Sequence, residues 1–188
     1  PAGSLQLSSN ATYFISGGCG ALGLELSHFL IQSGARNLAL LSRSGERSLA
    51  TRSLAPLRGK GAKIVVFTGD VSVKADVVRV IDELSQAPWP ELKGVFHLAG
   101  LYEQERASEC TAESFERMLA AKARGAAILH EATIELSLDH FVLFSSVSSI
   151  IGPIGFAAYA AAYAAANAFL DGLARMRREM DLAALSVQ

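Results

Sequence analysis

The 188-residue chain predicts an α/β fold in which helices cover both faces of a doubly wound parallel sheet. Two observations carry this prediction. Short apolar runs of the kind that form buried parallel strands alternate with longer helical patterns along the whole chain. In addition, a glycine-rich segment from Ser16 to Gly23 stands directly between the first apolar run and the first helical pattern. A chain of this length is expected to form one domain with its own core.

The expected strands are Thr12–Ser16, Asn37–Leu41, Lys63–Thr68, Gly94–Leu98, Phe141–Phe144 and Ala184–Val187. The expected helices fill the gaps: Ala21–Gln32, Ser48–Arg58, Val73–Ser85, Ala112–Thr133 and Phe156–Met180. Residues 1–10 resemble a linker in composition, and residues 11–188 form the predicted domain. The last strand looks cut short, so we expect the C-terminal part of the fold to be missing.

Composition excludes several function classes. A formal net charge of −1 gives no electrostatic basis for binding nucleic acid or a membrane surface. The longest apolar stretch, Ile150–Ala166, is shorter than the roughly 18 residues of a membrane span, and glycine and proline interrupt it. Two cysteines, Cys19 and Cys110, provide neither a disulfide framework nor a set of metal ligands. We therefore expect a reducing, cytoplasmic environment and no metal.

The glycine-rich segment predicts a dinucleotide site. Gly18, Gly20 and Gly23 match the pattern GxGxxG in the required position between a strand and a helix. Glycines let the backbone turn tightly and approach a pyrophosphate, whose charge is met by free N–H groups at the helix start. The residues expected to contact the cofactor here are Gly17, Gly18, Cys19, Gly20, Ala21 and Leu22. Cys19 is expected to be a small loop residue rather than a reactive thiol.

Ser42 and Arg43, at the end of the second expected strand, indicate which cofactor is bound. An acidic residue at this place would accept hydrogen bonds from an adenosine 2′-hydroxyl, whereas a hydroxyl and a guanidinium suit a 2′-phosphate. The sequence therefore favours NADPH over NADH. Asp70 and Val71 follow the third strand, and the Asp70 carboxylate either holds the adenine amino group or caps the loop.

Small residues also end the fourth strand, in the segment His97-Leu98-Ala99-Gly100. Ala99 and Gly100 would let a cofactor lie against the end of the strand. His97 is expected to be a structural residue rather than a carrier of protons.

Hydroxyl groups gather around the fifth strand and the helix that follows it. Ser145 and Ser146 stand at the strand's carboxyl end, and Tyr159, Tyr163 and Asn167 are spaced by four along the next helix. A spacing of four puts these three side chains on one helix face. A serine at a strand end that faces tyrosines on the next helix resembles the active site of the short-chain dehydrogenase/reductases.

Six segments extend this resemblance to nearly all of residues 11–188: ATYFISGGCGALG, LALLSRSG, GVFHLAG, AAKARGAAILHEAT, FVLFSSVSSIIG and NAFLDGLA. In this order they resemble the ketoreductase (KR) domain of a modular type I polyketide synthase. The resemblance implies a Rossmann-like doubly wound parallel sheet of the short-chain dehydrogenase/reductase type. It also implies NADPH-dependent reduction of a β-ketoacyl chain held on the phosphopantetheine arm of an acyl carrier protein, among neighbouring synthase domains.

The resemblance further implies a catalytic set. Its lysine comes from the preceding long helix rather than from a Tyr-x-x-x-Lys motif, which this chain lacks. Serine and tyrosine hydroxyls would hold the developing oxyanion, and the tyrosine would then supply the proton while the nearby ammonium favours its ionised form. The implied residues are Lys122, Ser146, an active-site tyrosine and Asn167.

The tyrosine is ambiguous because the chain carries one extra AAAY unit. Tyr159 lies thirteen residues after Ser146, as in the family, whereas Tyr163 lies four before Asn167, also as in the family. Four helical residues advance about 6 Å, so both tyrosines cannot occupy one site. We expect Tyr159 to be the active tyrosine and Tyr163 to take the asparagine position. A looped-out insert that delivers Tyr163 with Asn167, or a site in which neither register works, is the alternative.

The extra helical turn also keeps a second function open: a catalytically silent cofactor-binding or scaffolding domain of the same kind of synthase. A nucleotide-sugar epimerase or dehydratase is disfavoured because no Tyr-x-x-x-Lys is present. The product's stereochemistry is not predicted. Tyr102-Glu103-Gln104 stands where the family's LDD triplet marks one alcohol configuration, and the only tryptophan, Trp89, is not at the position that marks the other.

Overall fold

A computed structural model describes residues 7–47, 54–101, 111–150 and 157–188, with side chains described from 161 onward in the last range. Six parallel strands form one sheet in the order β3-β2-β1-β4-β5-β6. The strands are β1 (Thr12–Ser16), β2 (Asn37–Ser42), β3 (Lys63–Thr68), β4 (Leu92–His97), β5 (His140–Phe144) and β6 (Leu185–Val187). This order confirms the predicted doubly wound parallel sheet, with its topological switch point between β1 and β4.

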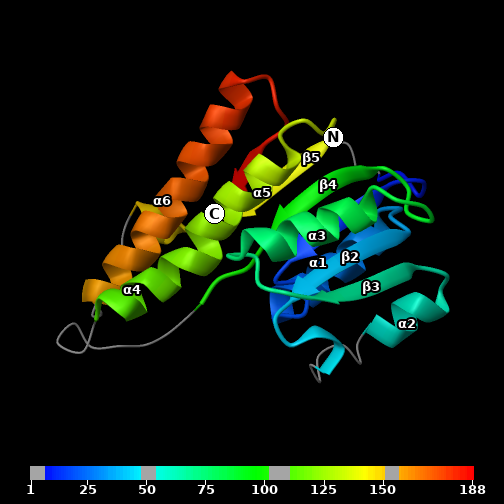
Figure 1. The fold of residues 1–188 in the computed structure, drawn as a ribbon, viewed down its shortest axis with the longest axis horizontal. Helices are drawn as coiled ribbons and strands as arrows, with labels where there is room; N and C mark the ends of the chain where they lie inside the picture. The colour runs from blue at the N-terminus through cyan, green and yellow to red at the C-terminus, as the bar shows by residue number, and fades with distance from the viewer. Residues whose placement is uncertain (1–6, 48–53, 102–110, 151–156) are drawn as a thin grey trace.

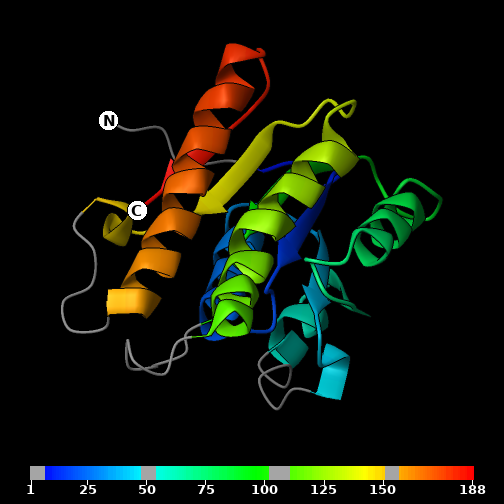
Figure 2. The ribbon, with the colours of Figure 1, turned by 60° about the vertical axis from the view of Figure 1, so that its left-hand side comes forward.

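Helices cover the two faces of the sheet (Figures 1 and 2). They are α1 (Ala21–Gln32), α2 (Ala55–Gly59), α3 (Lys74–Leu84), α4 (Ala112–Leu119), α5 (Gly125–Thr133) and α6 (Ala157–Glu179). The described residues also form the short turns η1 (Gly45–Arg47), the π-helical η3 (Ala120–Arg124) and η4 (Val147–Ser149). Side chains of α3, α5 and α6 share one core with the sheet, and those of α1 and α2 share another.

Strand β1 shows how the sequence builds both cores at once. All five of its residues are buried, and successive side chains point to opposite faces of a strand. Phe14 accordingly packs in the core with α3, α5 and α6, whereas Tyr13 and Ile15 pack in the core with α1 and α2. A strand covered on both faces needs apolar residues on both, which explains why the three central residues of β1 are all apolar or aromatic.

The structure corrects one of these expectations and adds detail to two others. The helix expected over Ala112–Thr133 is divided into α4 and α5 by the π-helical turn η3. Of the helix expected over Ser48–Arg58, the structure describes α2, while residues 48–53 lie outside the described residues. The expected linker over residues 1–10 already packs on the domain at Leu7, which is buried and donates its backbone N–H to the Ser33 carbonyl at 2.8 Å.

Two further findings concern the described residues only. None of their helices is both long enough and apolar enough to cross a lipid bilayer. They contain no cluster of three or more histidine, cysteine or carboxylate side chains suited to a metal ion. Cys19 is a buried free thiol, and Cys110 lies outside the described residues.

Candidate active site

The glycine turn between β1 and α1 brings two strand ends into close contact. Gly17 has a φ of +72°, a left-handed conformation that favours glycine, and its N–H donates to the Leu41 carbonyl at 3.0 Å. A Cβ on Gly17 would lie only 2.9 Å from the Ala99 backbone nitrogen. The turn therefore requires glycine at this position, and it places the start of α1 beside the ends of β2 and β4.

A cavity of about 910 Å³ opens beside this turn, at the carboxyl ends of the strands. Open α/β sheets bind their ligands in such a crevice at the switch point. Nine predicted cofactor residues line it: Gly17, Cys19, Gly20, Ser42, Arg43, Asp70, Val71, Ala99 and Gly100. These residues, predicted from several sequence motifs, therefore line one cavity in the structure.

Three other predicted cofactor residues, Gly18, Ala21 and Leu22, do not line the cavity. Gly18 packs against Leu40 so closely that a Cβ would lie 2.8 Å from the Leu40 Cβ, which makes it a packing residue. Leu22 leaves 68% of its surface exposed to solvent. The helical phase of α1 explains this, because its first and second residues, Ala21 and Leu22, face solvent.

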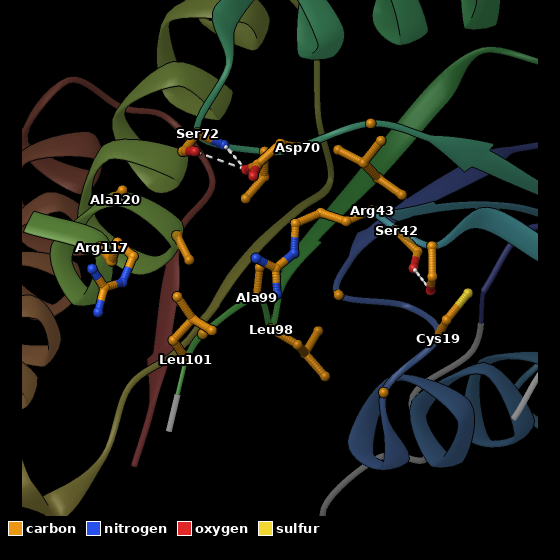
Figure 3. Close-up of a pocket in the computed structure, with 18 residues that line it drawn as sticks. Cys19, Ser42, Arg43, Asp70, Ser72, Leu98, Ala99, Leu101, Arg117 and Ala120 are labelled. Atoms are coloured by element: carbon orange, nitrogen blue, oxygen red, sulfur yellow. Dashed lines mark hydrogen bonds between the residues drawn. The ribbon is translucent and has the colours of Figure 1, made fainter. Parts of the chain in front are cut away.

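Arg43 extends from the end of β2 into the middle of the cavity (Figure 3). Among the described residues it has no hydrogen bond or ion pair, so its guanidinium is available to an anion. Next to it, the Ser42 and Ser44 hydroxyls lie 3.2 Å apart. Burial raises the pKa of the Cys19 thiol, and a hydrogen bond with Ser42 opposes this only partly. Cys19 is therefore a packed thiol in the cavity wall, as the sequence predicts.

Asp70 caps the loop after β3. Its Oδ1 accepts hydrogen bonds from the backbone N–H of Ser72 at 2.9 Å and from the Ser72 hydroxyl at 2.7 Å (Figure 3). The Asp70 N–H in turn donates to the Asp76 carboxylate at 2.8 Å. Of the two roles left open by the sequence, the structure shows the cap, and the carboxylate still lies on the cavity wall.

The sequence did not identify every residue of the wall, which also includes Ser44, Ser72, Leu98, Leu101 and Arg117. Ser72 stands two residues after an aspartate, a spacing typical of a side-chain-capped turn, so a local signal existed. Arg117 comes from α4, on the opposite side of the cavity from Arg43 (Figure 3). No local sequence pattern predicts that Arg117 lines the cavity, because its position depends on how α4 packs against the rest of the fold.

Lys122 and Tyr163 meet next to this cavity. Lys122 lies in η3 and is only 7% exposed, and its Nζ lies 4.8 Å from the centroid of the Tyr163 ring on α6. Burial lowers the pKa of the Lys122 ammonium, and attraction to Tyr163 and then to Asp171 partly offsets this. The structure thus brings together a buried ammonium and a phenol from two helices that adjoin in the fold (Figure 1).

Asn167 lies one turn further along α6 and is fully buried. Its Nδ2 donates to the Tyr163 carbonyl at 2.7 Å, and its Oδ1 has no hydrogen-bond partner among the described residues. The Ser145 hydroxyl donates to the Asn167 carbonyl at 3.2 Å, which ties the end of β5 to α6. A buried acceptor without a partner is costly unless a water or a ligand donates to it.

Ser146 caps the start of η4, just after the end of β5. Its hydroxyl accepts from the Ser148 N–H at 3.2 Å and lies 3.1 Å from the Ser148 hydroxyl. It is partly exposed. Ser146 therefore lies just after the carboxyl end of β5, as the sequence predicts.

The preferred tyrosine register, with Tyr159 as the active residue, stays a prediction. Tyr163 is the tyrosine whose ring lies beside Lys122 among the described side chains, and its carbonyl accepts a hydrogen bond from Asn167. Tyr159 lies one turn earlier in α6, about 6 Å along the axis, and its side chain is outside the described residues. The preference for Tyr159 counted residues from Ser146, whereas the position of Lys122 is set by a different helix.

His97 is buried beneath the lysine and makes two hydrogen bonds. Its Nδ1 lies 2.6 Å from the Ser16 hydroxyl and its Nε2 lies 2.8 Å from the Lys122 carbonyl. Because a carbonyl only accepts, Nε2 carries the proton and Nδ1 accepts from Ser16. Burial lowers the pKa of His97 to about 4, so the ring is neutral at physiological pH. This environment fits the predicted structural role.

This burial predicts an acid-labile fold. The folded pKa of His97 is about 4 against 6.5 for an ordinary histidine, so the unfolded chain binds the extra proton between these values. Stability is fully present above pH 6.5 and is lost as the pH falls toward 4, by about 3 kcal/mol. Urea unfolding of the wild type and of His97→Gln at pH 7 and pH 4 measures it. Between pH 7 and pH 4, the free energy of unfolding of His97→Gln should fall by about 3 kcal/mol less than that of the wild type. Equal losses in the two proteins would contradict the prediction.

Comparison with known proteins identifies the family. Residues 11–188 match the family model described as KR domain. The chain is 38% identical over 192 residues to 6-methylsalicylic acid synthase of Penicillium patulum, covering 94% of this chain and 10% of that protein. It is 39% identical to the phenolphthiocerol synthesis polyketide synthase type I Pks15/1 of Mycobacterium marinum, covering 95% of this chain and 8% of that protein. The chain thus spans about a tenth of the length of these relatives.

Solved structures show the same relation. A ketoreductase from the first module of phoslactomycin biosynthesis in Streptomyces sp. HK803 superposes with a TM-score of 0.88 at 37% identity, covering 99% of this chain and 42% of that one. The first ketoreductase of the tylosin polyketide synthase gives 0.85 at 37% identity, covering 98% and 39%. With a family match over nearly its whole length, the chain belongs to the KR family, the ketoreductase domains of polyketide synthases.

Proposed function

We propose that this chain reduces the β-keto group of an acyl chain held as a thioester on the phosphopantetheine arm of an acyl carrier protein, with NADPH as reductant. Membership of the KR family supports ketoreduction. The observation that carries the proposal is the buried Lys122 ammonium set against the Tyr163 ring. A cation held at a phenol beside a dinucleotide-sized cavity is the arrangement that proton delivery to a ketone requires.

The residues around the cavity fit a nicotinamide dinucleotide. The volume of about 910 Å³ falls in the range of small-molecule sites, about 300–1,000 Å³. Gly17 and Gly20 leave backbone exposed in the wall, where side chains would fill the space next to Ala99 and the Gly17 carbonyl. NADPH supplies the hydride when bound. Gly17, Gly20, Ala99 and Gly100 would hold it by close backbone approach, and Ser42 and Arg43 would bind its 2′-phosphate.

The other residues act on the ketone oxygen, which becomes negative as the carbon is reduced. Hydroxyl groups from Ser146 and Tyr163 would donate hydrogen bonds to that oxygen. Tyr163 would then give up its proton to form the alcohol, and the Lys122 ammonium stabilises the phenolate that remains. The unpartnered Asn167 Oδ1 is suited to accept from a water or from the ammonium, which would orient the lysine.

One assay tests the proposal. The full-length protein is incubated with NADPH and a β-ketoacyl thioester of N-acetylcysteamine. Oxidation of NADPH is followed as the loss of its absorbance. Thioester-dependent oxidation is expected. Binding of NADPH without oxidation would support the silent scaffold instead, an alternative that the retained Lys122, Tyr163 and Asn167 disfavour.

The cofactor preference is tested separately through Arg43. We expect tighter binding of NADPH than of NADH, because a guanidinium pairs with a 2′-phosphate by strong charge-assisted hydrogen bonds. Arg43→Ala should weaken NADPH binding by about 10- to 100-fold while leaving NADH binding nearly unchanged, since hydrogen bonds to charged groups contribute about 1.5–3 kcal/mol. Fluorescence titration with both cofactors measures this.

Arg47→Ala is the matched control, because Arg47 is an exposed arginine of the same loop that does not line the cavity. It should leave both affinities unchanged. Equal affinities of the wild type for NADPH and NADH would remove the 2′-phosphate argument, whatever the reductase activity.

A further inference from the structure

We propose that His97 is a positioning residue for Lys122: by donating to the Lys122 carbonyl it fixes the π-helical turn that directs the lysine toward Tyr163. The inference rests on the proposed role of Lys122 in reduction. It assigns His97 a function that its burial alone does not explain, because a histidine kept only for packing needs no bond to the backbone of a catalytic residue.

The first observation is the turn itself. In η3 the Gly125 N–H donates to the Ala120 carbonyl, five residues back, and also to the Lys122 carbonyl. The bond to Ala120 spans one residue more than a turn of α-helix. Each helical residue rotates the chain by about 100°, so the added residue changes which face the following side chains occupy. Met118 before the turn packs against Ala162 of α6, Leu129 after it packs in the sheet core, and Lys122 between them faces Tyr163.

The second observation is the hydrogen bond that enters the turn from outside. His97 Nε2 donates to the Lys122 carbonyl at 2.8 Å, while Nδ1 accepts from Ser16. Ser16 and His97 are paired neighbours at the ends of β1 and β4 in the middle of the sheet. The Ser16 hydroxyl therefore holds the tautomer that has a proton on Nε2, and two central strands hold the ring in place.

The third observation is a close contact on the other side of the turn. A Cβ on Gly125 would lie 2.8 Å from Val71 Cγ1 and 3.1 Å from His97 Cε1, so α5 begins directly against the imidazole. All of these groups are buried, with exposed fractions of 0% for Ser16, 1% for His97 and 7% for Lys122. Water does not compete for the bonds, which strengthens them and makes their loss costly.

These contacts predict what happens when the donor is removed. The buried Lys122 carbonyl would lose its imidazole partner and keep only the N–H of Gly125, and the turn could relax toward a regular α-helix to replace the lost bond. Such a relaxation rotates Lys122 away from Tyr163 by up to about 100°. The lysine would still be present and intact, but its ammonium would no longer lie at the phenol.

The test compares His97→Leu, which removes the donor, with His97→Gln, whose side-chain amide can still donate to Lys122. Thr133→Val is the matched control, because it removes a buried hydroxyl of α5 that donates to Leu129 at 2.6 Å, away from the turn. A second variant, Gly125→Ala, pushes α5 off the imidazole and leaves His97 unchanged. Each is made in the full-length protein, and its folding is checked by circular dichroism.

Two readouts are measured. Acetic anhydride labelling followed by mass spectrometry reports how accessible Lys122 is, with the exposed Lys60 as internal standard. Reduction of the β-ketoacyl thioester reports kcat. We expect His97→Leu and Gly125→Ala to raise labelling of Lys122 and to lower kcat by about 10- to 100-fold, as misplacement of a catalytic group does. His97→Gln should restore both toward the wild-type values, and Thr133→Val should change neither.

Unchanged labelling of Lys122 in His97→Leu would overturn the inference, and so would increased labelling with an unchanged kcat. Lys122→Met, assayed in parallel, separates this from the proposed function. If Lys122→Met keeps full activity, the proposed role of the lysine is wrong, and positioning for catalysis is overturned with it. The labelling data still report whether His97 holds the turn.

Discussion

Replacing Tyr163 with phenylalanine is expected to reduce ketone reduction by about 10²- to 10⁴-fold, the range contributed by a positioned general acid. The phenol is the group that the structure sets beside the Lys122 ammonium, and the variant removes only its hydroxyl. NADPH binding should persist, because Tyr163 does not line the cavity. Steady-state rates with the thioester and a separate NADPH titration measure the two effects.

Tyr159→Phe is the matched control, one helical turn away in the same helix. It should retain near-normal activity. If instead Tyr159→Phe abolishes reduction and Tyr163→Phe does not, then the register counted from Ser146 is correct, and the pair formed by Lys122 and Tyr163 is not the working one.

Replacing Lys122 with methionine is expected to remove reduction by at least about 10²-fold while leaving the fold as stable as the wild type, or more stable. Activity falls because no cation remains to stabilise the phenolate. Stability is kept because burial lowers the pKa of this ammonium from its ordinary 10.5, so the folded state disfavours the charge that the unfolded chain carries. Replacement of a buried charge by an apolar side chain of similar length is often neutral or stabilising.

The stability difference between Lys122→Met and the wild type is expected to depend on pH. A lysine with a lowered folded pKa destabilises the fold fully at low pH, and the destabilisation disappears as the pH rises toward 10.5. The stability difference between Lys122→Met and the wild type should therefore narrow from pH 7 to pH 10 in urea unfolding. Lys60→Met, at an exposed position, should show no such difference. A large loss of stability in Lys122→Met would contradict the argument.

The sequence predicted the sheet well because its signals are local. The run Thr12–Ser16, with three central apolar residues, predicts a strand covered on both faces, and the glycines after it permit the left-handed conformation of a tight turn. The same reasoning found the cavity wall at Ser42, Arg43 and Ala99, since each of these residues directly follows or ends a strand. The carboxyl ends of parallel strands lie at the same edge of the sheet, so residues at these ends line one cavity.

The rest could not be predicted locally. Nothing in the alanine-rich segment around Lys122 signals a π-helical turn, because the hydrogen bond that enters it comes from His97, on a strand 25 residues earlier. The tyrosine register also depends on tertiary packing and stays a prediction. Counting from Ser146 treats the connection to α6 as fixed in length, whereas the place of Lys122 beside Tyr163 depends on how α4 and α6 pack. Arg117 was missed for this reason too.

The position of β1 in the middle of the sheet has a consequence for the order of folding. Ser16 meets His97 across 81 positions of sequence, and the cofactor cavity is closed only when that pairing has formed. Long-range pairing must overcome the entropy of closing a large loop before it gains any contact, so such steps are slow. While the chain is being synthesised, β1, β2 and β3 can pair early, but the backbone N–H and C=O groups along the other edge of β1 stay unpaired until β4 emerges. A dinucleotide that binds only the completed cavity would therefore stabilise the finished sheet by mass action. It would shift the equilibrium from chains in which β4 is not yet paired toward the complete sheet.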